Sequence, residues 1–79
     1  MIYKLKNSSV RELIRALEKD GFQYTRRKGS QRVYRHSDGR RVVMHFHHPK
    51  DTLPPGTLQN FLSGTQWNEA DCKRLGLIN

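Results

Sequence analysis

The sequence is poor in apolar residues, and its apolar runs are short. Hydrophobic residues make up 34% of the 79 residues, and no uninterrupted apolar run approaches the roughly 20 residues that span a bilayer. The N-terminus lacks the apolar core of a signal peptide. We therefore expect a cytoplasmic protein with no membrane segment. At this length we also expect a single domain, residues 1–79, with a shallow surface site rather than a deep pocket.

Cysteine is nearly absent, because Cys72 is the only one in the chain. A single cysteine cannot form an internal disulfide, so a fold built on a disulfide framework is excluded. We interpret Cys72 as a small apolar residue packed on a helix rather than as a reactive thiol.

Acidic residues are scarce: the chain has 7 of them against 15 lysines and arginines, and its formal net charge is +8. Between Phe22 and Arg41 the only acid is Asp38, whereas the basic residues there are Arg26, Arg27, Lys28, Arg32, Arg35, Arg40 and Arg41. Such concentrated positive charge favours an anionic partner, with nucleic acid ahead of a membrane surface. The alternative is a charged face that only keeps the domain in solution.

A helix is predicted over residues 10–20, where apolar residues recur at the i, i+3, i+4, i+7 spacing of one helical face. Ser9 and Glu12 have the spacing of a capping box at its start. Gly21 suits the left-handed position that ends a helix.

Three strands are predicted after this helix, over residues 22–27, 31–36 and 40–48. Gly29 and Gly39 supply the tight turns between them, since glycine adopts positive φ without steric cost. In the first strand, strict alternation would place Phe22, Tyr24 and Arg26 on one face of the sheet.

Two prolines then lead into a second apolar helix, which we expect to end at Gly64. Asn68 is a candidate cap for a further short helix, and Trp67 is interpreted as a packing anchor between the two. The predicted fold is α+β, an αβββα(α) two-layer sandwich with a three-stranded antiparallel sheet. It resembles the double-stranded RNA-binding domain, which reads A-form shape through phosphate and 2′-hydroxyl contacts.

Several stretches together resemble the HicA toxins, also called the YcfA-like family: "LIRALEKDGF", "RRKGSQRVYRH", "VVMHFHHPKDTLPPGTL" and the apolar helix that follows. The resemblance covers residues 9–62, and residues 63–79 extend beyond it as a helical addition. It implies a toxin of a type II toxin–antitoxin module that arrests translation as a ribosome-independent mRNA interferase. It also implies mRNA as substrate, a HicB-like antitoxin that masks the active surface, and no metal or other cofactor.

The resemblance places the family's catalytic histidine directly after a Gly-Ser step, where this chain has Gly29, Ser30 and then Gln31. Imidazole can act as a general acid or base near neutral pH, whereas an amide only donates and accepts hydrogen bonds. We therefore expect a weakened or inactive endoribonuclease. The alternative is a non-catalytic RNA-binding module with the same fold.

His36 is a second and weaker catalytic candidate, because strand alternation places it on the opposite face from Gln31. Its other interpretation is a polar residue at the end of a strand. His45 and His47 share a face of the third strand, from which they could meet Gln31 or the RNA. A metal site at these histidines would rest on spacing alone, and we expect none.

The RNA-binding candidates surround the hairpin tip and the loop beside it: Lys28, Gly29, Ser30, Arg32, Arg26, Arg27, Arg35 and Lys50. Lys28 and Arg32 flank the tip and are the leading phosphate contacts. Tyr24 and Tyr34 are candidates either for stacking on bases or for packing across strands.

Overall fold

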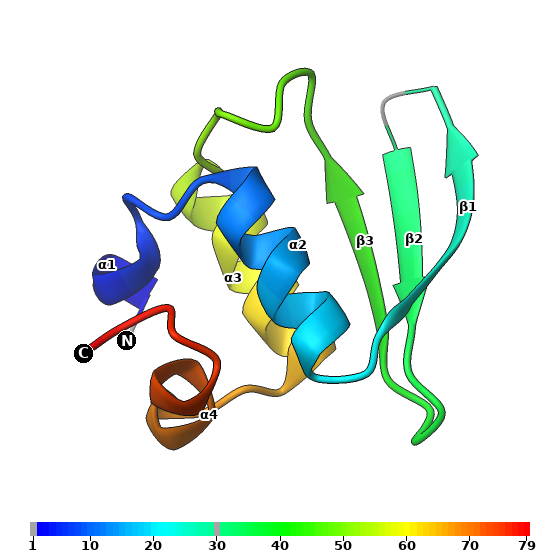
Figure 1. Cartoon of the computed structure of the whole chain (residues 1–79). Coiled ribbons are helices and arrows are strands. Elements are labelled where there is room, and N and C mark those ends of the chain that lie inside the picture. Colours follow the sequence, from blue (N-terminus) through cyan, green and yellow to red (C-terminus); the bar gives the residue numbers. More distant parts are fainter. Residues whose placement is uncertain (1, 30) are drawn as a thin grey trace.

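A three-stranded antiparallel sheet carries helices on one of its faces (Figure 1). We describe residues 2–29 and 31–79 of a computed structural model, with the side chains of all of these except residues 2, 3 and 26–28. The elements, in chain order, are α1 (Ile2–Leu5), α2 (Val10–Lys19), β1 (Gln23–Lys28), β2 (Gln31–Arg35), β3 (Arg41–His45), α3 (Pro55–Thr65) and α4 (Glu69–Arg74). The predicted α+β fold is confirmed, and the short helix α1 is an addition to it.

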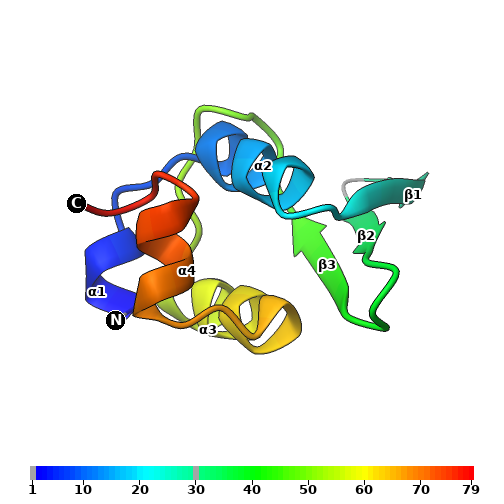
Figure 2. The same ribbon diagram turned by 60° about the horizontal axis from the view of Figure 1, so that its bottom comes forward.

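The helices form two groups (Figures 1 and 2). α2 and α3 lie next to the sheet, whereas α1 and α4 lie side by side farther from it. An ion pair between Lys4 and Glu69 joins α1 to α4. No helix in the described part of the chain is long and apolar enough to cross a bilayer.

The first long helix starts at Val10 as the sequence predicts and ends at Lys19, one residue before the predicted end. The Ser9 hydroxyl accepts a hydrogen bond from the Glu12 amide at 3.2 Å, and the Glu12 carboxylate accepts one from the Ser9 amide at 3.2 Å. Gly21 follows the helix with φ of 100°. Glycine suits this position for two reasons. The positive φ strains other residues, and a Cβ here would lie only 3.0 Å from His36 Nε2.

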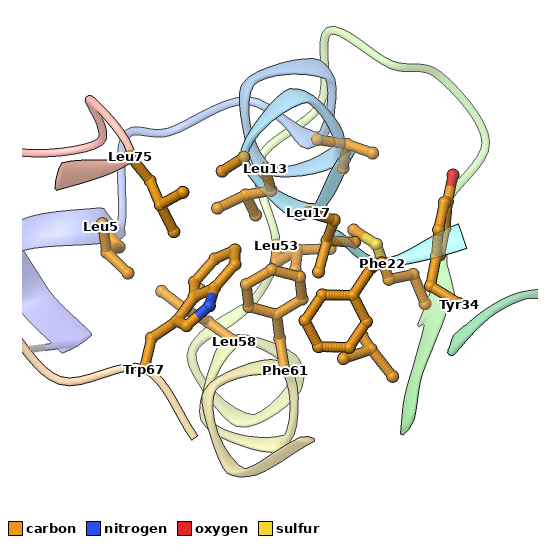
Figure 3. Packing of buried hydrophobic residues seen from close by; sticks show 14 of the residues in the cluster. Leu5, Leu13, Leu17, Phe22, Tyr34, Leu53, Leu58, Phe61, Trp67 and Leu75 are labelled. Carbon is orange, nitrogen blue, oxygen red and sulfur yellow. The ribbon is translucent and has the colours of Figure 1, made fainter. Parts of the chain in front are cut away.

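The core lies between the sheet and the helices, and three aromatic rings run through it (Figure 3). Trp67 packs edge-on against Phe61, with ring centroids 5.5 Å apart, and against Phe22 at 6.4 Å. Trp67 is 5% exposed, which confirms its role as a packing anchor. Cys72 is also confirmed as a packed residue, because it is fully buried and burial raises the pKa of its thiol.

β1 contains a bulge that simple alternation does not predict. Tyr24 pairs with Tyr34 and Arg26 pairs with Val33, which leaves Thr25 as the extra residue. The Thr25 hydroxyl donates a hydrogen bond to the Val33 carbonyl at 3.0 Å. Because a bulge shifts strand parity by one residue, the prediction that Tyr24 and Arg26 share a face is wrong.

The predicted end of the second long helix at Gly64 is also wrong. α3 continues to Thr65 and is closed by Gln66, which takes the left-handed conformation with φ of 58°. Gly64 instead marks the closest approach of α3 to β3. A Cβ at this position would lie 2.7 Å from the Arg41 carbonyl oxygen and 3.2 Å from Val42 Cγ2.

Replacing Gly64 with alanine is therefore expected to lower the free energy of unfolding by about 1–3 kcal/mol, the usual cost of overpacking. Gly56→Ala in the first turn of the same helix is the matched control. A Cβ there meets nothing within 4 Å, so that substitution should leave stability unchanged or raise it. Urea unfolding of the two variants measures the difference, and equal midpoints would contradict the close approach of α3 to β3.

Candidate nucleic-acid interface

Gln31 lies at the tip of the β1–β2 hairpin, at the start of β2. It is half-buried and pairs with Lys28 on one side and with His45 on the other. Directly opposite residues in antiparallel strands have Cβ atoms about 4.5–5.5 Å apart. The sheet register therefore makes the exposed His45 the nearest cross-strand imidazole to Gln31.

Gln31 belongs to the face of the sheet that the helices leave uncovered. Tyr34, Val42 and Met44 have the opposite parity, are 2%, 2% and 0% exposed, and form part of the core. Among the residues whose side chains are described, the uncovered face, called the open face below, consists of Gln31, Val33 and Arg35 of β2, Arg41, Val43 and His45 of β3, and Gln23 of β1.

Arg35 and Arg41 lie directly opposite each other at the far end of the open face. Both side chains are exposed, and within the described residues neither has an ion-pair partner. Like charges directly opposite each other destabilise a sheet. An anion bound between them would remove that cost.

The loop that follows β3 is held beside the hairpin tip by the start of α2 (Figure 1). The Val10 amide donates to the Asp51 carbonyl at 2.8 Å, and the Arg11 amide donates to the Pro49 carbonyl at 2.9 Å. These bonds use helix-terminal amides that would otherwise lack partners. The anchored loop presents the exposed side chains of His47, His48 and Lys50.

Arg32 lies on the other side of the sheet from Gln31, although it is the next residue. It pairs with Met44 of the core face. Its guanidinium carbon is 4.8 Å from the centroid of the Phe46 ring and 6.0 Å from that of Tyr24. Lys28 and Arg32 flank the tip in sequence, but the register pairs Lys28 with Gln31 and Arg32 with Met44. The two positions therefore belong to opposite faces of the sheet, as strand parity predicts.

His36 lies at the opposite end of β2 from Gln31, roughly 16 Å away along an extended strand. Its Nε2 is 2.7 Å from the Asp20 carbonyl oxygen, and the Asp38 amide donates to Nδ1 at 3.1 Å. Its ring packs edge-on against Phe22 at 5.1 Å. The Nε2–H tautomer satisfies both hydrogen bonds, so these contacts describe a structural role, and a catalytic role for His36 stays a prediction.

Arg40 lies within the basic segment but is engaged with the rest of the protein. Its guanidinium is 3.1 Å from an Asp20 carboxylate oxygen, 2.7 Å from an Asp38 oxygen and 2.6 Å from the Thr65 carbonyl. It also lies over the Phe22 ring at 4.9 Å. Only Asp38 is close to Arg40 in sequence; the contacts with Asp20 and Thr65 are not indicated by the local sequence, because these partners are distant along the chain.

Asp20 is the centre of this network. Its carboxylate accepts hydrogen bonds from Trp67 Nε1 at 2.8 Å and from Arg74 at 2.9 Å, in addition to the Arg40 contact. Burial alone would raise the pKa of Asp20, but the hydrogen bonds from Trp67 and Arg74 and the charge of Arg40 outweigh it and hold that pKa below its usual range.

The described structure does not cover every residue of the candidate interface. Ser30 lies outside the described residues, and so do the side chains of Arg26, Arg27 and Lys28. Gly29 has φ of 61°, as its turn requires. Within the described residues, no three His, Cys, Asp or Glu side chains are grouped as metal ligands.

Comparison with known proteins assigns the chain to a family. The sequence model of the HicA toxin of bacterial toxin–antitoxin systems matches residues 10–70. That range starts with α2, contains the whole sheet and α3, and ends within α4. No curated protein matches the chain. Since the family model spans most of its length, the chain belongs to the HicA toxin family of bacterial toxin–antitoxin modules.

Proposed function

We propose that this protein is an mRNA interferase toxin that binds RNA across the open face and the hairpin tip, with cleavage weakened by Gln31. The observation that carries the proposal is the opposed pair Arg35 and Arg41, which has no acidic partner in the described residues. In protein–DNA complexes, half or more of the hydrogen bonds go to phosphate and sugar. Two guanidiniums without an acidic partner, side by side on the open face, suit such contacts.

The chemistry proposed for the tip needs no cofactor. RNA is cleaved when its own 2′-hydroxyl attacks the adjacent phosphorus, with a base to remove the hydroxyl proton and an acid to protonate the departing 5′-oxygen. The Gln31 amide can hold a phosphate oxygen but cannot take or supply that proton. His45 lies directly across the sheet from Gln31, so it is the imidazole best placed for any cleavage that remains.

Membership of the HicA family implies an antitoxin partner. We propose that this partner is a HicB-like protein that covers the open face and so competes with mRNA in the cytoplasm. We also propose that residues 1–79 act as one domain, because Leu5 of α1 and Cys72 of α4 belong to the same buried cluster as the residues between them.

RNA binding by this face is expected to depend steeply on salt, because each phosphate contact releases counterions. Fluorescence anisotropy with a labelled single-stranded RNA, from low to physiological salt, measures the slope of log affinity against log salt. Each lost phosphate contact should reduce that slope by about 0.7. The double variant Arg35→Gln, Arg41→Gln should therefore have a slope smaller by about 1.4.

The matched control is Lys19→Gln, Lys73→Gln, which removes the same charge from exposed helical positions and should leave the slope almost unchanged. An equal loss in both double variants would mean that net charge, and not the open face, drives binding. No affinity for RNA even at low salt would contradict the proposal and favour a basic face that serves only an acidic protein partner. RNA binding without cleavage, both by the parent protein with Gln31 and by a Gln31→His variant, would support a non-catalytic RNA-binding module.

A further inference from the structure

We infer that Tyr24 and Arg32 form a stacking site for one unpaired nucleobase, on the side of the sheet away from Gln31. The inference rests on the proposed function in RNA binding and adds a requirement for single-stranded substrate. It concerns the edge strand β1, where the two faces of the sheet meet solvent.

Tyr24 stands out because, among the described residues, it is the large hydrophobic side chain that is exposed to solvent, with a relative accessibility of 50%. Its ring packs against that of Tyr34, with centroids 5.7 Å apart and planes at 47°. Tyr34 itself is 2% exposed, at the edge of the core (Figure 3). Tyr24 therefore rests on a fixed support while much of its own surface is open to a ligand.

Arg32 adds positive charge and a second planar group beside this ring. Its guanidinium carbon lies 4.8 Å from the Phe46 centroid and 6.0 Å from the Tyr24 centroid. No carboxylate in the described residues forms an ion pair with it. Packing on Phe46 restricts the guanidinium, so less conformational entropy is lost when it contacts a ligand.

The Arg32 guanidinium packs on Phe46 and hydrogen-bonds with Tyr34, but it has no carboxylate partner among the described residues. An aromatic face beside such a guanidinium matches the chemistry of a nucleotide. The base stacks on the ring, while the arginine contacts the phosphate or the face of the base. Bases within a duplex already stack on their neighbours, so this site favours unpaired RNA. Since every base has a π-face, the site should tolerate different base identities.

The position of the site connects it to the open face. β1 has β2 on one side only, and strands are about 4.8 Å apart. A flexible single strand that contacts the hairpin tip can pass around this edge and place one base on Tyr24. The rigid backbone of a duplex cannot follow the same path.

Two substitutions of Tyr24 distinguish stacking of a base on the ring from apolar contact with the side chain. Tyr24→Phe keeps the ring, whereas Tyr24→Leu keeps an apolar side chain of moderate size without a π-face. Affinity for an unstructured RNA oligonucleotide should fall about tenfold in the Leu variant and change less than about twofold in the Phe variant. Affinity for an RNA duplex should be the same in both. Arg32→Lys, which keeps the charge and loses the planar group, should weaken binding of the oligonucleotide several-fold.

A series of RNA oligonucleotides, each with one abasic site at a different position, provides a second test of the stacking site. At one position the abasic site should weaken binding to the parent protein about tenfold and should have little further effect in Tyr24→Leu, as expected for two changes that remove one contact. The inference fails if the parent binds RNA and Tyr24→Leu binds it equally well, or loses single-stranded and duplex RNA alike. It also fails if Tyr24→Leu reduces affinity only for the antitoxin. If the parent binds no RNA at all, the proposed function itself fails.

Discussion

Gln31→His is expected to raise the rate of RNA cleavage by about 10²–10⁴-fold, the usual contribution of one general acid or base. Glutamine and histidine are similar in size, and position 31 is only half-buried at the tip of a hairpin, so the fold should accept the change. The new imidazole would face the RNA next to His45, its cross-strand neighbour. The cleavage rates of parent and variant are compared on one long single-stranded RNA. A chelator is present so that contaminating metal-dependent nucleases are inactive.

Gln23→His is the matched control for this experiment. Gln23 is an exposed glutamine on the same open face, but it pairs with Arg35 at the far end of the sheet. An imidazole there is far from the hairpin tip and should leave the cleavage rate at saturating RNA unchanged. Equal cleavage by the parent and by Gln31→His would show that residue 31 is dispensable, and His45→Gln would then be the next variant to test. Cleavage by neither protein, with RNA still bound, would assign the chain to non-catalytic RNA binding.

Asp20→Ala is expected to lower the free energy of unfolding by about 3 kcal/mol, a large share of the stability of a small domain. The Asp20 side chain is 10% exposed and pairs with Arg40, which is 18% exposed. It also accepts the hydrogen bond of the Trp67 indole at 2.8 Å. Without the carboxylate, the indole N–H of Trp67 loses its partner, and the largely buried Arg40 guanidinium keeps only Asp38 and the Thr65 carbonyl. Urea unfolding at neutral pH measures the loss.

Asp38→Ala is the control, because Asp38 also pairs with Arg40 but has a side chain that is 46% exposed. Water can replace most of what that carboxylate supplies, so its removal should cost much less than removal of Asp20. Similar losses in the two variants would contradict the central role of Asp20.

Acid titration tests the same network independently. The pKa of Asp20 is lowered in the folded protein, so its contribution to stability is present above the unfolded-state pKa of about 3.9. It is lost as the pH falls through the lower folded-state value. Asp20→Asn, which cannot ionise, should be less stable at neutral pH and should lose less stability between pH 5 and pH 2. A parallel loss in parent and variant would show that Asp20 does not contribute to acid unfolding.

The sequence by itself determines the local structure and the chemistry at position 31. The capping box Ser9–Glu12 forms as its spacing predicts, and the candidate cap Asn68 accepts a hydrogen bond from the Asp71 amide at 2.8 Å. Such contacts join residues three positions apart, so a few side chains contain all the information needed. The sequence also predicts, through the resemblance to the family, that Gln31 occupies the position of the catalytic histidine, since this prediction depends only on the Gly-Ser step before it.

The tertiary structure decides what depends on residues distant in the chain. The role of Gly64 follows from the Arg41 carbonyl, which lies where a Cβ would be. Tyr24 becomes an exposed ring beside Arg32 through a bulge at Thr25 and the position of Phe46. Periodicity describes one segment at a time, whereas close approach, strand register and ion pairing depend on how segments pack together. That is why the sequence predicts the elements of this protein and only the packed structure shows which of their side chains meet.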